Sequence, residues 1–126
     1  MSSNKNKFDL EDRLIDFAVR IIRITESMPK TKTGTHISNQ LLRSGTSPAS
    51  NYGEAQSAES RSDFIHKMKI SLKELRETKV WLQIIIKAEL ITPATILAPL
   101  LDETNQLISI FVTSVTTAKK NKAKKV

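Results

Sequence analysis

The chain has 126 residues, with only three glycines, four prolines and no cysteine. This length suits a single domain, and the scarcity of glycine and proline beside abundant leucine, isoleucine, lysine and alanine favours helices over a sheet. The lack of cysteine excludes a disulfide framework, a thiolate metal site and a cysteine nucleophile.

The formal net charge is +7, and it is unevenly distributed. Lysines crowd residues 119–126, whereas basic and acidic side chains nearly balance over the rest of the chain. We predict a basic C-terminal tail at 119–126, either a solvated, disordered end or a nonspecific contact for polyanions. Residues 1–8 are predicted to be a flexible N-terminus. Because there is no apolar signal core and no run of about 18 apolar residues, we expect a cytoplasmic protein without a membrane partner.

The first helix is predicted over residues 9–27. Its apolar residues alternate four and three positions apart, a coiled-coil-like seam that comprises Leu10, Leu14, Phe17, Ile21, Ile24 and Met28. Pro29 ends this helix, because the residue before a proline is pushed out of the helical region.

The second helix is predicted over residues 35–58, with Thr35 as its N-cap. Pro48 lies inside this span and cannot donate a hydrogen bond to the Ser44 carbonyl. Two interpretations follow: one bent helix, or a break with Ser47 as a new N-cap and Pro48 at the first helical position. The apolar arc stays in phase through Pro48, which favours the bent helix.

The third helix is predicted over 61–89, with Ser60 as its cap, and the fourth over 93–118, starting at Thr92 and Pro93. Short loops make successive helices antiparallel. The sequence therefore predicts an all-α fold, an up-down-up-down four-helix bundle over residues 9–118.

The predicted helices carry more apolar surface than one bundle can bury. In the segment Val80–Ile86 only Gln83 is polar, and the apolar residues of the fourth helix spread over more than one stripe. We predict self-association, with the contact formed by Trp81, Ile84, Ile85, Ile110 and Val112. The alternative is that Ile91–Pro99 folds back over this surface.

No catalytic or metal site is predicted, and no cofactor. Asp63 and His66 are three residues apart, but a di-iron bundle needs two Glu-x-x-His pairs and two further glutamates, and no acidic residue lies three before His36. Ser44–Ser47 lacks the strand and the lysine of a phosphate-binding loop, so we interpret its small residues as a site of close helix packing.

A polar face is predicted on the second and third helices. It comprises Gln40, Arg43, Ser47, Asn51 and Glu54, opposite Glu74 and Glu77. Arg43 is placed to meet Glu74 or Glu77, either in the same chain or across subunits. The face is either a network that sets helix register or a groove for a partner.

Basic side chains suggest a nucleic-acid surface. The candidates are Lys69, Lys73, Arg76 and Lys87 on the third helix, Arg13, Arg20 and Arg23 on the first, and Lys119, Lys120, Lys122, Lys124 and Lys125 in the tail. Aromatic residues are few and no stacking platform for bases is visible, so recognition of backbone charge is expected rather than of base sequence.

Residues 35–81 resemble the four-helix bundle proteins first named after open reading frames inside intervening sequences of bacterial large-subunit rRNA genes. The matching pieces are Leu42-Arg43-Ser44-Gly45-Thr46-Ser47, Asn51-Tyr52-Gly53-Glu54-Ala55, Ala58-Glu59-Ser60-Arg61, Phe64-Ile65-His66-Lys67, Leu72-Lys73-Glu74, Glu77-Thr78 and Trp81. The resemblance covers about residues 10–115 and implies a cyclic homo-oligomer, a pentamer. A more distant resemblance is to the accessory protein of diversity-generating retroelements, a basic pentamer that works with nucleic acid.

The leading hypothesis is a non-enzymatic oligomeric bundle that binds RNA or another nucleic acid through backbone charge. The alternative is a protein-interaction or assembly scaffold with no nucleic-acid role. No small-molecule substrate is predicted, because no acid–base or metal constellation is readable.

Overall fold

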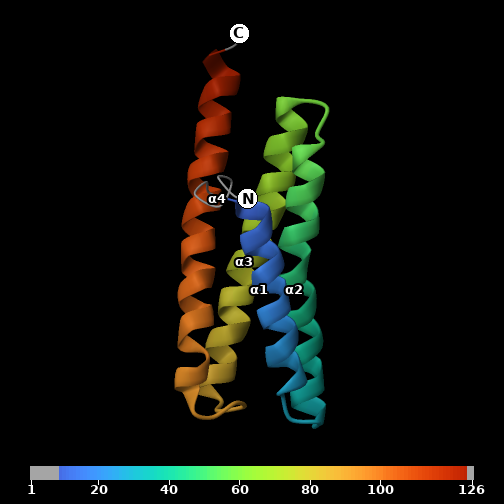
Figure 1. Cartoon of the computed structure of the whole chain (residues 1–126), viewed down its shortest axis with the longest axis vertical. Coiled ribbons are helices and arrows are strands. Elements are labelled where there is room, and N and C mark those ends of the chain that lie inside the picture. The colour runs from blue at the N-terminus through green and yellow to red at the C-terminus, as the bar shows by residue number, and fades with distance from the viewer. Residues whose placement is uncertain (1–8, 125–126) are drawn as a thin grey trace, which may run out of the picture.

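The computed structural model describes residues 9–124 and shows four long helices, with no strand in this part of the chain. They are α1 (Leu10–Glu26), α2 (Lys32–Gln56), α3 (Arg61–Lys87) and α4 (Ala98–Lys124), and a 3₁₀ turn, η2 (Ala94–Ile96), precedes α4. Successive helices alternate in direction (Figure 1). The predicted all-α, four-helix fold is confirmed.

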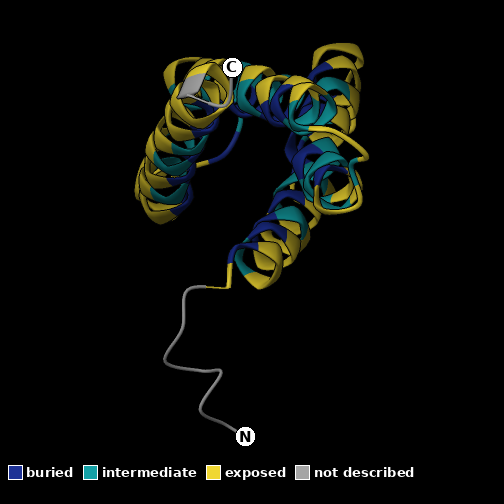
Figure 2. Ribbon diagram, turned by 90° about the horizontal axis from the view of Figure 1, so that it is seen from above, coloured by how far each residue is buried: buried dark blue, intermediate teal, exposed yellow. Residues whose placement is uncertain are grey.

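The helices are arranged along an open arc. α1 packs on α2, α2 on α3 and α3 on α4, whereas α1 and α4 have little contact. Viewed from above, the four helices form a C shape whose open side lies between α1 and α4 (Figure 2). α1, with 17 residues, is shorter than the 27-residue α4. It therefore begins part-way along α4 (Figure 1).

The core follows the predicted seams. Leu14, Phe17 and Ile21 of α1 are buried against Leu41 of α2, and Leu75 and Leu82 of α3 with Leu107 and Phe111 of α4 complete the same cluster. Each of these side chains is at most 1% exposed. Their spacing keeps one apolar face of each helix toward the interior, which stabilises the fold by removing that face from water.

The start of α2 differs from the prediction. Its N-cap is Thr31 rather than Thr35, because the Thr31 hydroxyl accepts a hydrogen bond from the Gly34 amide at 3.0 Å. A side chain at position 34 would come within 2.1 Å of the Pro29 carbonyl oxygen. Glycine at 34 therefore lets the helix begin one turn earlier, close behind the loop.

α2 runs without interruption through Pro48, so the continuous helix is confirmed and the break is excluded. At the other predicted cap, Ser60 accepts a hydrogen bond from the Asp63 amide at 3.0 Å, as expected. α1 and α3 end within two residues of their predicted ends.

α4 begins later and continues further than predicted. Residues 94–96 form only a 3₁₀ turn after Pro93, and the α-helix starts at Ala98. Its far end reaches Lys124, so residues 119–124 are helical rather than a separate tail. Lysine and alanine are good helix formers, and cations are favoured near a helix C-terminus. The predicted flexible residues 1–8, and Lys125 and Val126, lie outside the described residues.

Candidate nucleic-acid interface

The predicted polar face joins α2 to α3 through three direct contacts. The Arg43 guanidinium pairs with Glu77, the Asn51 amide donates to Glu74 at 2.9 Å, and the Lys67 ammonium donates to Glu54 at 2.6 Å. Gln40 also accepts a hydrogen bond from Arg43. Arg43 thus meets one of its two expected partners.

The same face is more buried at its centre. Burial raises the pKa of Glu74, although the Asn51 amide and the Arg43 charge act in the opposite direction. The Trp81 indole donates to Glu77 at 3.0 Å and lies edge-on to His36. Because these polar groups satisfy one another within the chain, the contacts favour the network that sets helix register over an open groove.

Small residues of α2 allow close packing, as expected for Ser44–Ser47. A side chain at position 45 would lie 2.7 Å from an Ile21 carbon, so Gly45 is needed where α1 crosses α2. On the other side of α2, the Thr78 hydroxyl donates to the buried Ser44 hydroxyl at 2.9 Å. This segment therefore positions both neighbouring helices.

The basic candidates of α3 lie on its outer surface. Lys69, Lys73, Arg76 and Lys87, called the outer row below, are all exposed. No carboxylate of residues 9–124 forms an ion pair with any of them. Arg20 and Arg23 of α1 are also exposed and unpaired within this range.

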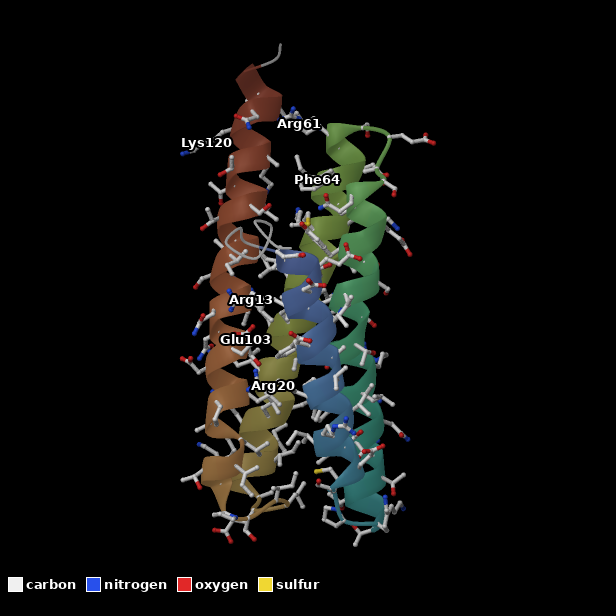
Figure 3. The ribbon with its side chains drawn as sticks, in the orientation of Figure 1. Arg13, Arg20, Arg61, Phe64, Glu103 and Lys120 are labelled. Carbon is white, nitrogen blue, oxygen red and sulfur yellow. The ribbon has the colours of Figure 1, made fainter. Side chains whose placement is uncertain are left out.

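Arg13 has a structural role instead of a free charge. Its guanidinium contacts both carboxylate oxygens of Glu103 on α4, at 2.7 and 3.0 Å, and Gln106 at 3.2 Å (Figure 3). This pair connects α1 and α4, the two ends of the arc. Two parallel hydrogen bonds between a guanidinium and a carboxylate are stronger than hydrogen bonds between neutral groups. Because Glu103 offsets its charge, Arg13 is a weaker candidate for phosphate contact than the outer row, and its binding of nucleic acid stays a prediction.

The C-terminal lysines extend the last turns of α4. Lys119, Lys120 and Lys122 are exposed, and the Lys122 ammonium contacts the Ser62 hydroxyl at the start of α3. Lys120 and Arg61 lie at the same end of the molecule (Figure 3). Lys124 is the last residue of α4, and Lys125 lies outside the described residues.

The predicted self-association residues are not all accessible. Ile85 is fully buried, which corrects its assignment to a contact surface: the core face of α3 continues through Leu82 to Ile85. Trp81 and Ile110 are half-buried, whereas Ile84 and Val112 are exposed. Val80 is the most exposed apolar residue of this segment, at 52%. In the segment after α3, Ile91 and Leu97 are buried in the core, whereas Ile96 is 54% exposed.

Sequence reasoning missed an apolar stripe on α1. Ile15, Val19 and Ile22 are 46%, 41% and 38% exposed, and Leu42 of α2 is exposed as well. The three α1 residues, called the α1 stripe below, are four and three positions apart and so share a face. The signal was present in the sequence as a second periodic set opposite the core seam.

Within residues 9–124, no group of three histidine or acidic side chains is placed to hold a metal ion. No helix in the same range is long and apolar enough to cross a membrane.

These features define an all-α bundle in which a polar network fixes α2 against α3 and the outer row faces solvent. The sequence profile of the 23S rRNA-intervening sequence proteins matches residues 6–112, and the chain belongs to this family. The family resemblance of residues 35–81 is thereby confirmed.

A solved structure shares the fold. It is a protein of unknown function from the S23 ribosomal protein family of Bacteroides thetaiotaomicron VPI-5482, with 34% sequence identity and a TM-score of 0.78. The match covers 85% of this chain and 98% of that protein. No curated protein matches the chain.

Proposed function

We propose that the protein is a non-enzymatic, oligomeric helical bundle that binds RNA through the phosphate backbone. The observation that carries this proposal is the outer row, whose four cations face solvent without an acidic partner in residues 9–124. Carboxylates of the neighbouring α2–α3 face, by contrast, are engaged by Arg43, Asn51 and Lys67. The row therefore presents unneutralised positive charge.

The row also has a suitable length. Lys69 and Lys87 are 18 positions apart on a continuous helix, which corresponds to about 27 Å at the rise of an α-helix. Successive phosphates of one strand are separated by a few ångströms, so this distance accommodates several contacts. Between Lys69 and Lys87 the one phenylalanine, tyrosine or tryptophan is Trp81, which is half-buried and bonded to Glu77 of the α2–α3 face. This supports recognition of charge rather than of base identity.

Self-association would multiply this surface, and we propose the closed ring that the family resemblance implies, a pentamer. Val80 and Ile84 lie between Arg76 and Lys87, so a contact there would cover one end of the outer row. The α1 stripe offers exposed apolar area on a different helix. Contact through α1 leaves the row open, and repeated weak phosphate contacts then add in avidity.

The test compares two double substitutions in the full chain. Lys69→Gln with Lys73→Gln removes two charges from the outer row, and Lys30→Gln with Lys32→Gln removes two exposed lysines near the α1–α2 loop. For RNA affinity measured against salt, we expect the first pair to reduce the slope by about 1.4–1.8, the value for two lost phosphate contacts, and the control to leave it unchanged. Equal losses from both pairs, or no RNA binding by the full chain at low salt, would overturn the proposal.

A second function, a protein-interaction scaffold, is favoured by the α1 stripe. Exposed apolar residues at helical spacing are typical of a surface that another helix covers. If the full chain ignores RNA yet forms oligomers that Val19→Lys disrupts in light scattering, the scaffold is the better account. If Val19→Lys leaves the assembled mass unchanged, the stripe is not the contact.

A further inference from the structure

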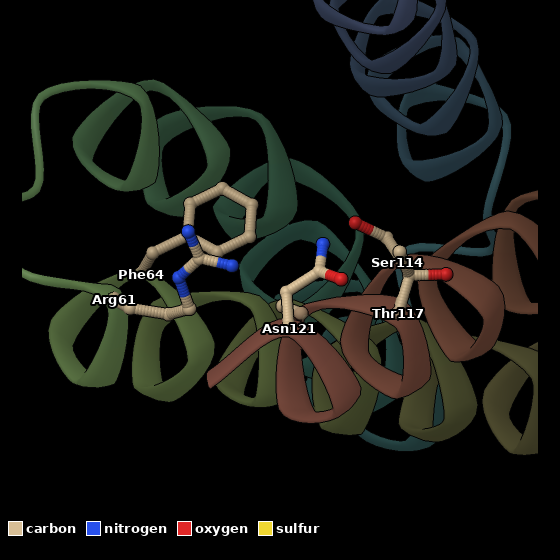
Figure 4. Close-up of a pocket in the computed structure, with 6 residues that line it drawn as sticks. Arg61, Phe64, Ser114, Thr117 and Asn121 are labelled. Carbon is tan, nitrogen blue, oxygen red and sulfur yellow. The ribbon is translucent and has the colours of Figure 1, made fainter. Parts of the chain in front are cut away.

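A cavity of about 470 Å³ lies where the start of α3 meets the end of α4. Its lining residues, called the end pocket below, are Arg61, Phe64, Ser114, Thr117, Ala118 and Asn121. Arg61 and Phe64 come from the first turn of α3, and the three polar residues of α4 lie across from them (Figure 4). A volume of this size is within the usual range for a small ligand.

The pocket lies past the first turn of α1, in the part of α4 that follows Phe111. The first turn of α1 reaches the level of Tyr52, whose pKa is raised by burial and then by the charges of Glu11 and Asp9. Tyr52 in turn packs edge-on against Phe111 of α4. Ser114, Thr117 and Asn121 all follow Phe111 along α4. The C-terminal part of α4 extends past the first turn of α1 (Figure 1).

Among the lining residues Arg61 alone is charged, and Lys122 of α4 lies close to the start of α3. Arg61 is half-buried and forms no ion pair in the described chain, although Glu59 and Asp63 flank it in sequence. Lys122 reaches the Ser62 hydroxyl beside it, and Lys119 and Lys120 are exposed on the same turns of α4. A ligand at this place meets positive charge from both helices.

The lining combines three kinds of group. The Phe64 ring, packed against the core on one side, supplies an aromatic surface. Arg61 supplies a planar donor suited to phosphate. Ser114, Thr117 and Asn121 supply hydrogen-bond donors and acceptors on one face of α4. A flat ring, a polar edge and a negative charge occur together in a nucleotide.

We propose that the end pocket receives one unstacked nucleotide of single-stranded RNA. The base stacks on Phe64, its polar edge or the ribose meets Ser114, Thr117 and Asn121, and the phosphate meets Arg61 and Lys122. This inference rests on the proposed RNA-binding function and adds to it a preference for single strands, because a paired base cannot enter the pocket.

The test measures the affinity of the full chain for a short oligouridylate and for a blunt RNA duplex with the same number of phosphates. Phe64→Leu keeps an apolar side chain against the core but removes the aromatic face. We expect it to weaken single-strand binding about 5- to 100-fold and to leave duplex binding unchanged. Arg61→Gln should also reduce the single-strand salt slope by about 0.7, and Lys32→Gln, which removes one charge at the far end of α2, should not change single-strand affinity by more than about twofold.

A variant at an exposed position guards against loss of folding. Asn121→Ala should weaken oligouridylate binding several-fold, while Asn105→Ala, exposed near the other end of α4, should have no effect. If the Phe64→Leu and Asn121→Ala variants both bind oligouridylate as tightly as the unsubstituted protein, the end pocket is not the site, although the outer row can still bind RNA. If the full chain binds neither RNA at low salt, the proposed function itself fails.

Discussion

Two sections of the bundle use the same side of α4 differently. In the section that α1 covers, Glu103 on α4 is held by Arg13 and the helices are tied together. Beyond the first turn of α1, Ser114, Thr117 and Asn121 line a cavity with Arg61 and Phe64. The comparison shows that polar residues on one side of α4 form contacts within the chain where α1 lies near them. Further along the same side, polar residues of α4 line a pocket.

The largest difference should appear when one aromatic side chain is removed from each section. Phe17 is fully buried in the covered section, so Phe17→Ala should lower the free energy of unfolding by about 3–5 kcal/mol. Phe64 is half-buried beside the pocket, and Phe64→Ala should cost about 1–2 kcal/mol because less apolar area returns to water. Urea unfolding measures both. Equal losses would mean that the pocket end is packed as tightly as the covered core.

A pair of glycines on α2 should respond with opposite sign. A methyl group at Gly45 meets Ile21 of α1, so Gly45→Ala should destabilise the fold by about 1–3 kcal/mol. A methyl group at Gly53 meets nothing within 4 Å, so Gly53→Ala should stabilise the helix by about 0.5–1 kcal/mol. Thermal unfolding of the two variants checks the signs. A destabilising Gly53→Ala would instead indicate that a second molecule approaches this position.

The pair that links α1 to α4 should contribute less. Glu103 and Arg13 side chains are 18% and 31% exposed, so solvent screens part of their attraction. A double-mutant cycle with Arg13→Gln and Glu103→Gln should give a coupling free energy of about 0.5–1.5 kcal/mol that falls as salt is raised. Asp16→Asn, at an exposed position of α1, serves as the control, since it should show no coupling to Glu103. A coupling free energy of zero would mean that the Arg13–Glu103 pair does not stabilise the contact between α1 and α4.

The smallest effect concerns pH at the α2–α3 network. Burial raises the pKa of Glu74 above its ordinary value of 4.5 in the folded protein. Folding therefore favours the protonated form, and this contribution to stability is present below the ordinary pKa and lost as pH rises through the folded-state pKa. Glu74→Gln still accepts the Asn51 hydrogen bond and lacks the titration. Unfolding midpoints from acidic to neutral pH should shift in favour of the variant as pH rises, and parallel profiles would exclude the burial effect.

The apolar spacing in the sequence predicted the helices correctly where the structure depends only on residues a few positions apart. The alternating seam from Leu10 to Met28 and the Ser60 cap depend on neighbours within a turn or two, and both appear in the structure. The start of α2 was misplaced because Thr31 and Thr35 are equally good caps in isolation. The choice between them depends on Gly34, which fits beneath the Pro29 carbonyl only in the folded loop.

The candidate site was harder to predict because exposure depends on which helix lies opposite. Arg13 and Arg20 belong to the same predicted basic set, yet within residues 9–124 Arg13 forms an ion pair and Arg20 does not. Ile84 and Ile85 are adjacent, yet one is exposed and the other buried. The end pocket joins residues of α3 to residues of α4 that are at least 50 positions away, so no local pattern indicates it.

The amino-acid sequence alone determined the class of fold and the membership of the family, because the first depends on apolar spacing along each helix and the second on a matched pattern. That Arg43 pairs with Glu77 rather than Glu74 depends on how α2 packs on α3. Tertiary structure decided which cations of residues 9–124 form ion pairs, which apolar residues stay exposed and where α4 extends past α1. Those properties depend on which helices lie side by side and on how far each extends. The sequence of one helix does not specify where a neighbouring helix ends.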